Sequence, residues 1–132
     1  MPAGGLVEPA KRDLGERLLT YAVRIVKVAD ALPKTSAGRH IGNQLLRSGT
    51  SAGANYEEAQ GGESRADFIH KLQVALKECR ESVYWLCLIE QAGLLPVQRL
   101  AGLIDEGKQL RAILSQSVIT AKQKLDPKYR KV

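Results

Sequence analysis

The stretch from Gln44 to Glu90 decides the fold of this 132-residue chain. It reads QLLRSGTSAGANYEEAQ over residues 44–60, GGES over residues 61–64, and RADFIHKLQVALKECRESVYWLCLIE over residues 65–90. Steps of three and four, the spacing of one helix face, join apolar residues in its third part and Leu45, Ser48, Ala52, Asn55 and Ala59 in its first, where the middle of the face is small and polar. The glycine pair between these parts is typical of a helix end. The stretch therefore predicts two helices joined by a short loop.

Start and stop signals on either side extend this pattern to four helices. Leu32-Pro33 ends a first helix, because proline donates no backbone hydrogen bond and disfavours the helical conformation in the residue before it. Thr35 or Ser36 can cap the second helix, and Ser64 can cap the third. We expect helices over residues 13–32, 37–60, 65–92 and 96–125, with a flexible lead-in over residues 1–12 and a basic tail over residues 126–132. Long helices, short connections and no strand pattern predict an all-α, antiparallel up-and-down four-helix bundle.

Two parts of the stretch are unusual for a surface helix. Gly49 and Gly53 each cost about 1 kcal/mol relative to alanine inside a helix, so we expect a neighbouring helix to approach closely there. Residues 83–89 (VYWLCLI) are apolar on every side, and in a chain of this size the extra apolar face is expected to meet another subunit. The candidate oligomer-interface residues are Tyr84, Trp85, Leu88 and Ile89.

The charge of the chain favours polyanionic partners. Its formal net charge is +6 and its pI is about 9.5, which attracts RNA or DNA without implying specificity. The candidate nucleic-acid-binding residues are Arg39, Arg47, Arg65, Lys71, Lys77, Arg80, Lys122, Lys124, Lys128, Arg130 and Lys131. The alternative is a solvated basic surface, in which lysines near the end of the fourth helix complement its dipole.

Polar, small and apolar residues follow one another along the stretch in a recognisable order and spacing. They are Gln44, Leu45, Leu46, Arg47, Ser48, Ser51, Ala54, Asn55, Glu58, Ala59, Ser64, Asp67, Phe68, Ile69, Leu72, Ala75, Leu76 and Glu78. This pattern resembles that of the four helix bundle proteins, also called 23S rRNA-intervening sequence proteins, over roughly residues 13–125. The chain reads Ser51-Ala52-Gly53-Ala54-Asn55 where that family more often has S-I-P-A-N, so the proline that would kink the second helix is absent.

The resemblance carries its own expectations about assembly and activity. It implies a bacterial up-and-down bundle that assembles into a ring, typically a homopentamer, with no established catalytic activity. It also implies a relation to the basic accessory protein of diversity-generating retroelements, which binds nucleic acid and a reverse transcriptase. The expected partners are therefore further copies of the chain, RNA or DNA, and a nucleic-acid-processing protein.

Carboxylates and hydroxyls in the second and third helices have two interpretations. Four residues are candidates for a polar network that fixes helix register: Ser51, Asn55, Glu58 and Glu78. Within it, Ser51 and Asn55 are expected to bond across to the third helix. The competing interpretation, a carboxylate metal site, requires Glu-x-x-His pairs that His40 and His70 do not form. We expect no metal, no cofactor and no catalytic residue.

The two cysteines indicate the compartment. Cys79 and Cys87 are eight residues apart on one predicted helix, so their Cα atoms lie roughly 12 Å apart, beyond the reach of a disulfide. Reduced thiols fit the cytoplasm. The start of the chain has no apolar leader, and no run reaches the roughly 18 to 20 apolar residues of a membrane span.

These observations predict a non-enzymatic, cytoplasmic homo-oligomer whose basic surface binds RNA or DNA without sequence specificity. The alternative is a protein-interaction scaffold with no nucleic-acid role, in which charge serves solubility. An enzyme ranks third, because no arrangement of residues supports it. The first two differ in salt dependence, since phosphate binding weakens steeply with salt and an apolar interface does not.

Overall fold

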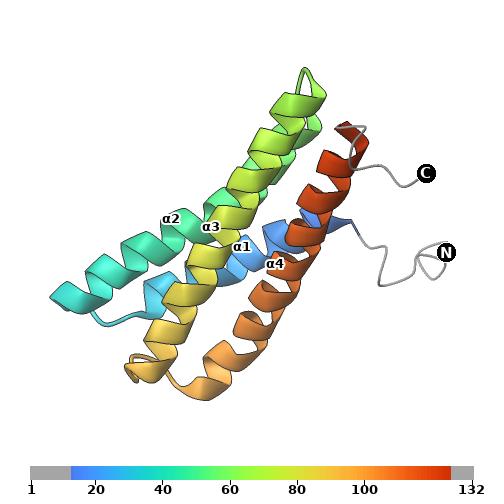
Figure 1. Cartoon of the computed structure of the whole chain (residues 1–132). Helices are drawn as coiled ribbons and strands as arrows, with labels where there is room; N and C mark the ends of the chain where they lie inside the picture. The colour runs from blue at the N-terminus through green and yellow to red at the C-terminus, as the bar shows by residue number, and fades with distance from the viewer. Residues whose placement is uncertain (1–12, 126–132) are drawn as a thin grey trace, which may run out of the picture.

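A computed structural model describes residues 13–125 and contains four helices and no strand among them. The helices are α1 (Leu14–Ala31), α2 (Ser36–Gln60), α3 (Arg65–Gln91) and α4 (Val97–Leu125). They form the predicted antiparallel bundle (Figure 1). Every helix begins and ends within one residue of its predicted boundary. The expected lead-in and basic tail lie outside the described residues.

Local hydrogen bonds explain where the helices begin and end. Of the two residues able to cap α2, Thr35 does so, because its Oγ1 accepts a bond of 3.0 Å from the N–H of Gly38. At the start of α3, Ser64 Oγ accepts from the N–H of Asp67 at 3.0 Å, as predicted. After α3, Gly93 has a φ of +70°, a conformation that side-chain-bearing residues rarely adopt.

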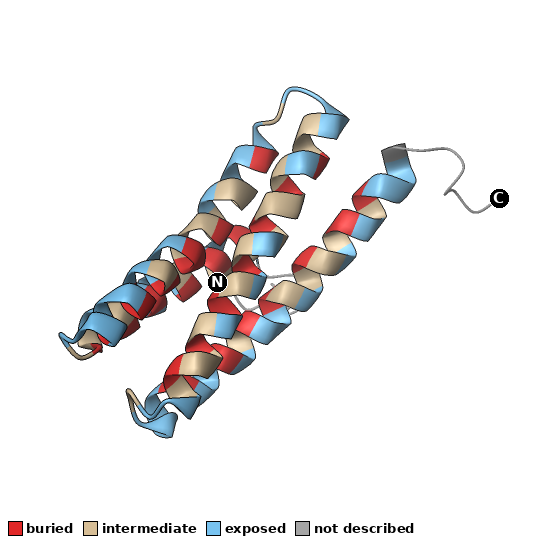
Figure 2. Cartoon of the chain, turned by 60° about the vertical axis from the view of Figure 1, so that its left-hand side comes forward, coloured by how far each residue is buried: buried red, intermediate tan, exposed pale blue. Residues whose placement is uncertain are grey.

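Helix α3 packs against both α2 and α4, whereas α1 lies mainly along α2 (Figure 1). Figure 2 shows the buried residues on the inward sides of the helices. The apolar run at 83–89 is largely explained by this position, because Val83, Leu86 and Ile89 are all buried within the chain. The prediction that Ile89 belongs to a subunit interface is therefore wrong, since its side chain is fully enclosed by the monomer's own core.

The small residues of α2 allow α1 to approach closely, as expected. A Cβ atom on Gly49 would lie 2.7 Å from Cγ1 of Ile25, and one on Gly53 would lie 3.3 Å from Cβ of Leu18. Both neighbours belong to α1 and are fully buried. The contact between α1 and α2 offsets the low helix propensity of glycine.

A buried hydroxyl chain joins α1 to α3 at Tyr21, whose ring also packs against α4. Tyr21 of α1 lies 2.7 Å from Ser82 of α3, whose Oγ donates to the carbonyl of Cys79 at 2.7 Å, so the Tyr21 hydroxyl donates to Ser82. Burial raises the pKa of Tyr21 and keeps this hydroxyl neutral. On α4, Gly107 leaves room for the ring, because a Cβ there would lie 2.8 Å from Tyr21 Oη.

We expect Gly49→Ala to destabilise the fold by about 1–3 kcal/mol, because the added methyl group overlaps Ile25. Gly102→Ala is the matched control: it is exposed on α4, and its Cβ would meet only the end of the flexible Arg24 side chain at 3.3 Å. That substitution should stabilise by about 0.5–1 kcal/mol. Urea denaturation followed by circular dichroism measures both, and equal effects of the two substitutions would contradict the close α1–α2 contact.

Candidate nucleic-acid interface

Ion pairs between α2 and α3 occupy two of the predicted basic residues. Arg47 donates to Glu78 at 2.9 Å and also bonds to Glu81. Lys71 donates to Glu58 at 2.7 Å, and this partner raises the pKa of Lys71. These cations already have carboxylate partners, so they are less available to phosphate groups than an unpaired cation is.

The predicted polar network is only partly formed. Glu58 and Glu78 do connect α2 to α3, through the ion pairs just described. The prediction that Asn55 and Ser51 bond across to α3 is wrong, because the Asn55 amide donates to the backbone carbonyl of Ser51, 2.9 Å away in the same helix. Side chains of this type often bond the backbone one turn earlier in their own helix. The register between α2 and α3 therefore does not depend on a hydrogen bond from Asn55.

The outward face of α3 carries two cations without acidic partners. Its members recur at steps of three and four and are His70, Gln73, Lys77, Arg80 and Tyr84, a set named here the α3 outer row. Lys77 and Arg80 are exposed, and no ion pair among residues 13–125 involves either. Tyr84 is 60% exposed. The row therefore offers two positive charges and an aromatic ring to solvent.

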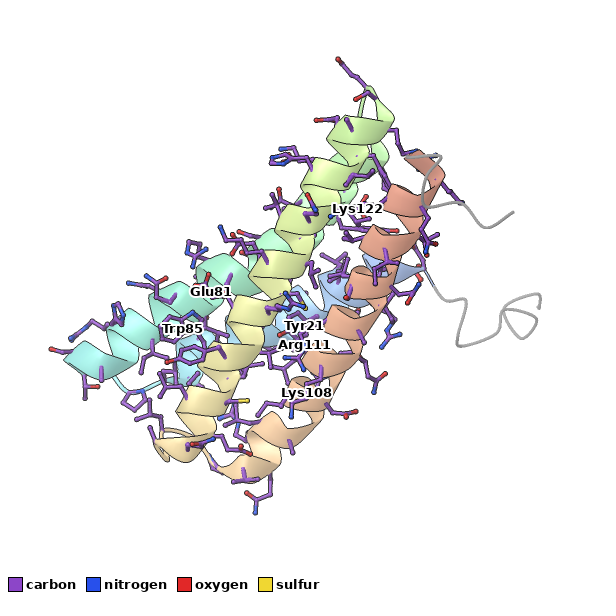
Figure 3. The ribbon with its side chains drawn as sticks, in the orientation of Figure 1. Tyr21, Glu81, Trp85, Lys108, Arg111 and Lys122 are labelled. Carbon is purple, nitrogen blue, oxygen red and sulfur yellow. The ribbon has the colours of Figure 1, made fainter. Side chains whose placement is uncertain are left out.

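Trp85 lies beside this row but turns toward α2. Its indole N–H donates to Glu81 at 2.9 Å, and its ring meets Tyr84 edge to face at 5.1 Å and His40 at 6.0 Å. Figure 3 shows Trp85 and Glu81 on the side of α3 that faces α2. Trp85 is half-buried and packs against the core, as does Leu88. Both therefore already contribute to the fold of one chain.

The remaining predicted cations are spread over the molecule. Arg39 is exposed on α2 and Lys122 on α4, whereas Arg65 and Lys124 line one groove between α3 and α4. Lys128, Arg130 and Lys131 lie outside the described residues. Two further cations of α4, Lys108 and Arg111, were missed by the sequence reasoning although both lie within the described helix (Figure 3). Their three-residue spacing was the signal that could have found them.

Exposed apolar side chains gather on α1, which the sequence reasoning also missed. Leu19 is 67% exposed, Val23 47% and Val26 39%, and they recur at steps of four and three, a set named here the α1 apolar stripe. Leu46 of α2 is 38% exposed. A second helical stripe beside the core stripe of α1 was visible in the sequence and was the signal for this surface.

The other chemistry-bearing groups form no reactive centre in the part of the chain that the structure describes. No group of three metal-ligating side chains occurs within residues 13–125. Cys79 and Cys87 are free thiols, and burial raises the pKa of Cys79 to about 11. None of the four described helices is long and apolar enough to cross a membrane.

The stability of the fold is expected to decrease as the pH rises above about 8.5, the ordinary thiol pKa. The folded state holds the Cys79 proton more tightly than the unfolded state does, so the protonated thiol adds to the free energy of unfolding. This contribution is complete below pH 8.5 and is lost as the pH approaches 11. Thermal melts between pH 7.5 and 9.5 should show a shallower decrease for Cys79→Ala than for the Cys87→Ala control. The same slope in both variants would contradict the role of burial at Cys79.

The chain is similar to known proteins in both sequence and fold. The family model described as 23S rRNA-intervening sequence protein matches residues 14–116. A solved structure, that of a protein with unknown function from the S23 ribosomal protein family of Bacteroides thetaiotaomicron VPI-5482, is 35% identical. Its match has a TM-score of 0.75 and covers 80% of this chain and 98% of that one. No curated protein matches the chain.

Proposed function

We propose, from the fact that this chain belongs to the 23S rRNA-intervening sequence protein family, that it acts in the cytoplasm as a homo-oligomeric protein that binds RNA or DNA and catalyses no reaction. The observation that carries the proposal is the α3 outer row, with exposed Lys77 and Arg80 beside exposed Tyr84. The binding would be an accessory role for a nucleic-acid-processing protein.

The α3 outer row suits the backbone of a nucleic acid. Residues three apart on a helix are surface neighbours, so Lys77 and Arg80 present their charges at adjacent positions. Cations of this kind contact phosphate oxygens and release counterions, which gives affinity without sequence information. Tyr84 adds an exposed ring on which an unpaired base can stack.

Self-association would multiply this charge. Five copies, the number that the family resemblance implies, would carry a formal charge of about +30, because each chain contributes +6. The α1 apolar stripe supports self-association, because exposed apolar side chains that gather on one helix face are typical of interaction surfaces. It lies on a different helix from the α3 outer row, so assembly through α1 leaves the cations of α3 accessible.

The same stripe favours a second candidate function, a protein-interaction scaffold without a nucleic-acid role. In that case the α1 apolar stripe binds a different protein, and the cations of α3 serve solubility. The two candidates differ in whether the isolated protein binds nucleic acid at all.

Neutralising the α3 outer row tests the first candidate. The double variant Lys77→Gln/Arg80→Gln should weaken binding to a 30-nucleotide RNA. It should also make the plot of log affinity against log salt less steep, by about one unit of slope for each phosphate that is no longer neutralised. The control Lys27→Gln/Lys34→Gln removes the same charge from exposed positions elsewhere. Fluorescence polarisation between 50 and 200 mM salt measures both, and equal weakening would show that net charge rather than the row determines affinity.

Polar substitution of the α1 apolar stripe tests self-association. Leu19→Ser/Val23→Ser should lower the mass of the assembly measured by light scattering, while leaving the fold intact, because both side chains are largely exposed. Trp85 is also a candidate interface residue, so Trp85→Ala is expected to lower either the oligomer mass or the stability. The half-buried position of Trp85 favours the second effect. An unchanged mass for the α1 variant would remove the stripe from the interface.

A further inference from the structure

A groove of about 480 Å³ lies between the beginning of α1 and the second half of α2. Leu19 and Ala22 of α1 and Gly53 of α2 form part of its apolar lining. Its volume is within the range of binding pockets in proteins. Because Leu19 also belongs to the α1 apolar stripe, the groove and the stripe form one continuous apolar surface.

Three carboxylates line this groove, and its described lining contains no lysine, arginine or histidine. Asp13 caps α1 and Glu16 lies in its first turn, where both complement the helix dipole. Glu57 lies instead near the end of α2, where the dipole disfavours a carboxylate. Burial raises the pKa of Tyr56, and the nearby charges of Asp13 and Glu57 add to this effect. No ion pair within residues 13–125 neutralises any of the three.

The outward face of α4 has the opposite charge. Its residues recur at steps of three and four and are Lys108, Arg111, Ser115, Ile119 and Lys122, a set named here the α4 outer row. Ile119 is 47% exposed, and Lys108 and Lys122 are exposed as well. Figure 3 shows the three cations along α4. None of them belongs to an ion pair in the described part of the chain. The row thus presents an aliphatic side chain between cations.

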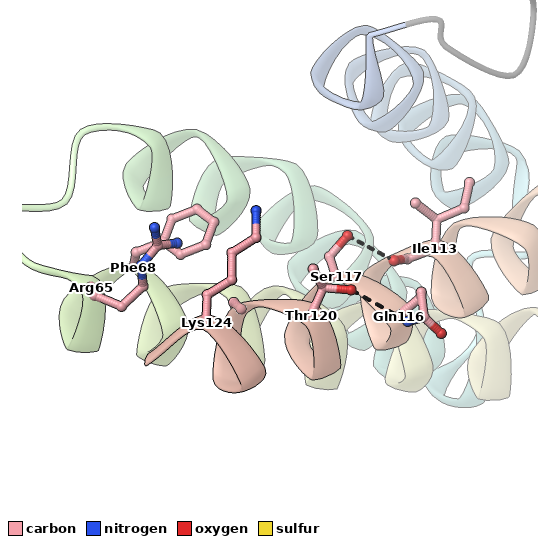
Figure 4. Close-up of a pocket in the computed structure, with 8 residues that line it drawn as sticks. Arg65, Phe68, Ile113, Gln116, Ser117, Thr120 and Lys124 are labelled. Carbon is pink, nitrogen blue, oxygen red and sulfur yellow. Dashed lines mark hydrogen bonds between the residues drawn. The ribbon is translucent and has the colours of Figure 1, made fainter. Parts of the chain in front are cut away.

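Polar side chains on the other sides of α4 are engaged within the helix itself. Ser117 Oγ donates to the carbonyl of Ile113 at 2.9 Å, and the Gln116 amide donates to Thr120 Oγ1 at 3.3 Å (Figure 4). These side chains therefore already have partners within α4, unlike the three cations of the outer row.

We propose that the groove binds the α4 outer row of a second copy of the chain, with Ile119 in the groove and the cations of the row beside its carboxylates. The inference rests on the proposed function in one respect, because it assumes that the chain self-associates. It goes further in naming the two surfaces that meet, since the α1 apolar stripe alone does not specify what covers it.

The contact joins two different surfaces of the chain. The groove belongs to α1 and α2, whereas the row belongs to α4, and α3 lies between α2 and α4 in the bundle. Each copy therefore offers its groove to one neighbour and its α4 outer row to another. Such a head-to-tail arrangement closes into a ring when the rotation between copies allows it. The α3 outer row takes no part in the contact and stays available to nucleic acid.

The α3 outer row is the competing occupant, because it also combines cations with an exposed apolar ring. It offers two cations, Lys77 and Arg80, whereas the α4 outer row offers three to the three carboxylates of the groove. Its ring, that of Tyr84, already meets Trp85 edge to face at 5.1 Å. The aliphatic Ile119 gains more from entering an apolar groove, because burial removes its exposed surface from water.

Charge reversal in the groove tests its half of the contact. Glu16→Lys/Glu57→Lys should raise the concentration at which the assembly half-dissociates about tenfold or more, because like charges then meet. The control Glu63→Lys/Asp105→Lys reverses two exposed carboxylates elsewhere and should leave that concentration nearly unchanged. Sedimentation and light scattering of the full chain measure the mass, and thermal melts verify that each variant folds.

Charge reversal on α4 tests the other half. Lys108→Glu/Lys122→Glu should weaken the assembly to a similar extent. The control Lys77→Glu/Arg80→Glu reverses the cations of the α3 outer row and should keep the mass of the assembly. A loss of mass in this control, with none in the α4 variant, would assign the groove to the α3 outer row and overturn the inference.

An equimolar mixture of the groove variant and the α4 variant gives the most specific readout. Each variant alone brings like charges together, whereas in the mixture the altered groove meets the altered row and the native groove meets the native row. Assembly that contains both chains should therefore recover, and weakening of each variant without recovery in the mixture would overturn the contact.

The remaining outcomes separate this inference from the proposed function. Unchanged mass in both double variants overturns the contact and leaves self-association standing. A groove variant with a lower melting temperature but unchanged mass means that another segment of the same chain covers the groove, which also overturns the contact. A wild-type chain that remains monomeric at every concentration overturns the proposed self-association and the contact together.

Discussion

Helix α3 is buried against α2 on one side and against α4 on the other, and this double burial determines which surfaces the bundle can offer. It takes Val83 and Ile89 into the core and holds Trp85 against α2 through Glu81. One row of α3 is left to face solvent, and that row carries Lys77 and Arg80. The position of these two cations is thus a consequence of core packing, because the residues on the other faces of α3 pack against α2 and α4.

Two close contacts hold the remaining helices to this arrangement. Gly49 lets α1 approach α2, since any side chain there would overlap Ile25. Tyr21 then reaches from α1 to Ser82 of α3 and fits against Gly107 of α4. A small residue on one helix and a large residue on its neighbour recur in both contacts, which fixes the register more strictly than apolar burial alone. These contacts explain why a bundle with little aromatic content can pack closely.

The sequence predicted the elements of this fold well and its surface poorly. Helix boundaries follow from local signals such as Pro33 and Ser64, which act through nearby backbone groups, and these predictions are confirmed. The pairing of Arg47 with Glu78 depends instead on residues 31 positions apart, and no local pattern specifies it. Ile89 was misplaced for the same reason, because a helix apolar on all sides does not reveal which neighbours cover it.

Net charge is therefore an incomplete guide to what this surface can bind. The charge of +6 counts Arg17 and Arg47 together with Lys77, yet the first two are engaged in ion pairs that join helices. A cation held between carboxylates contributes little potential beyond its pair, whereas an unpaired cation acts over roughly 8–10 Å at physiological salt. Arg65 is a further case, since its guanidinium lies over the ring of Phe68. The number of cations that face solvent without a carboxylate partner is therefore smaller than the net charge suggests.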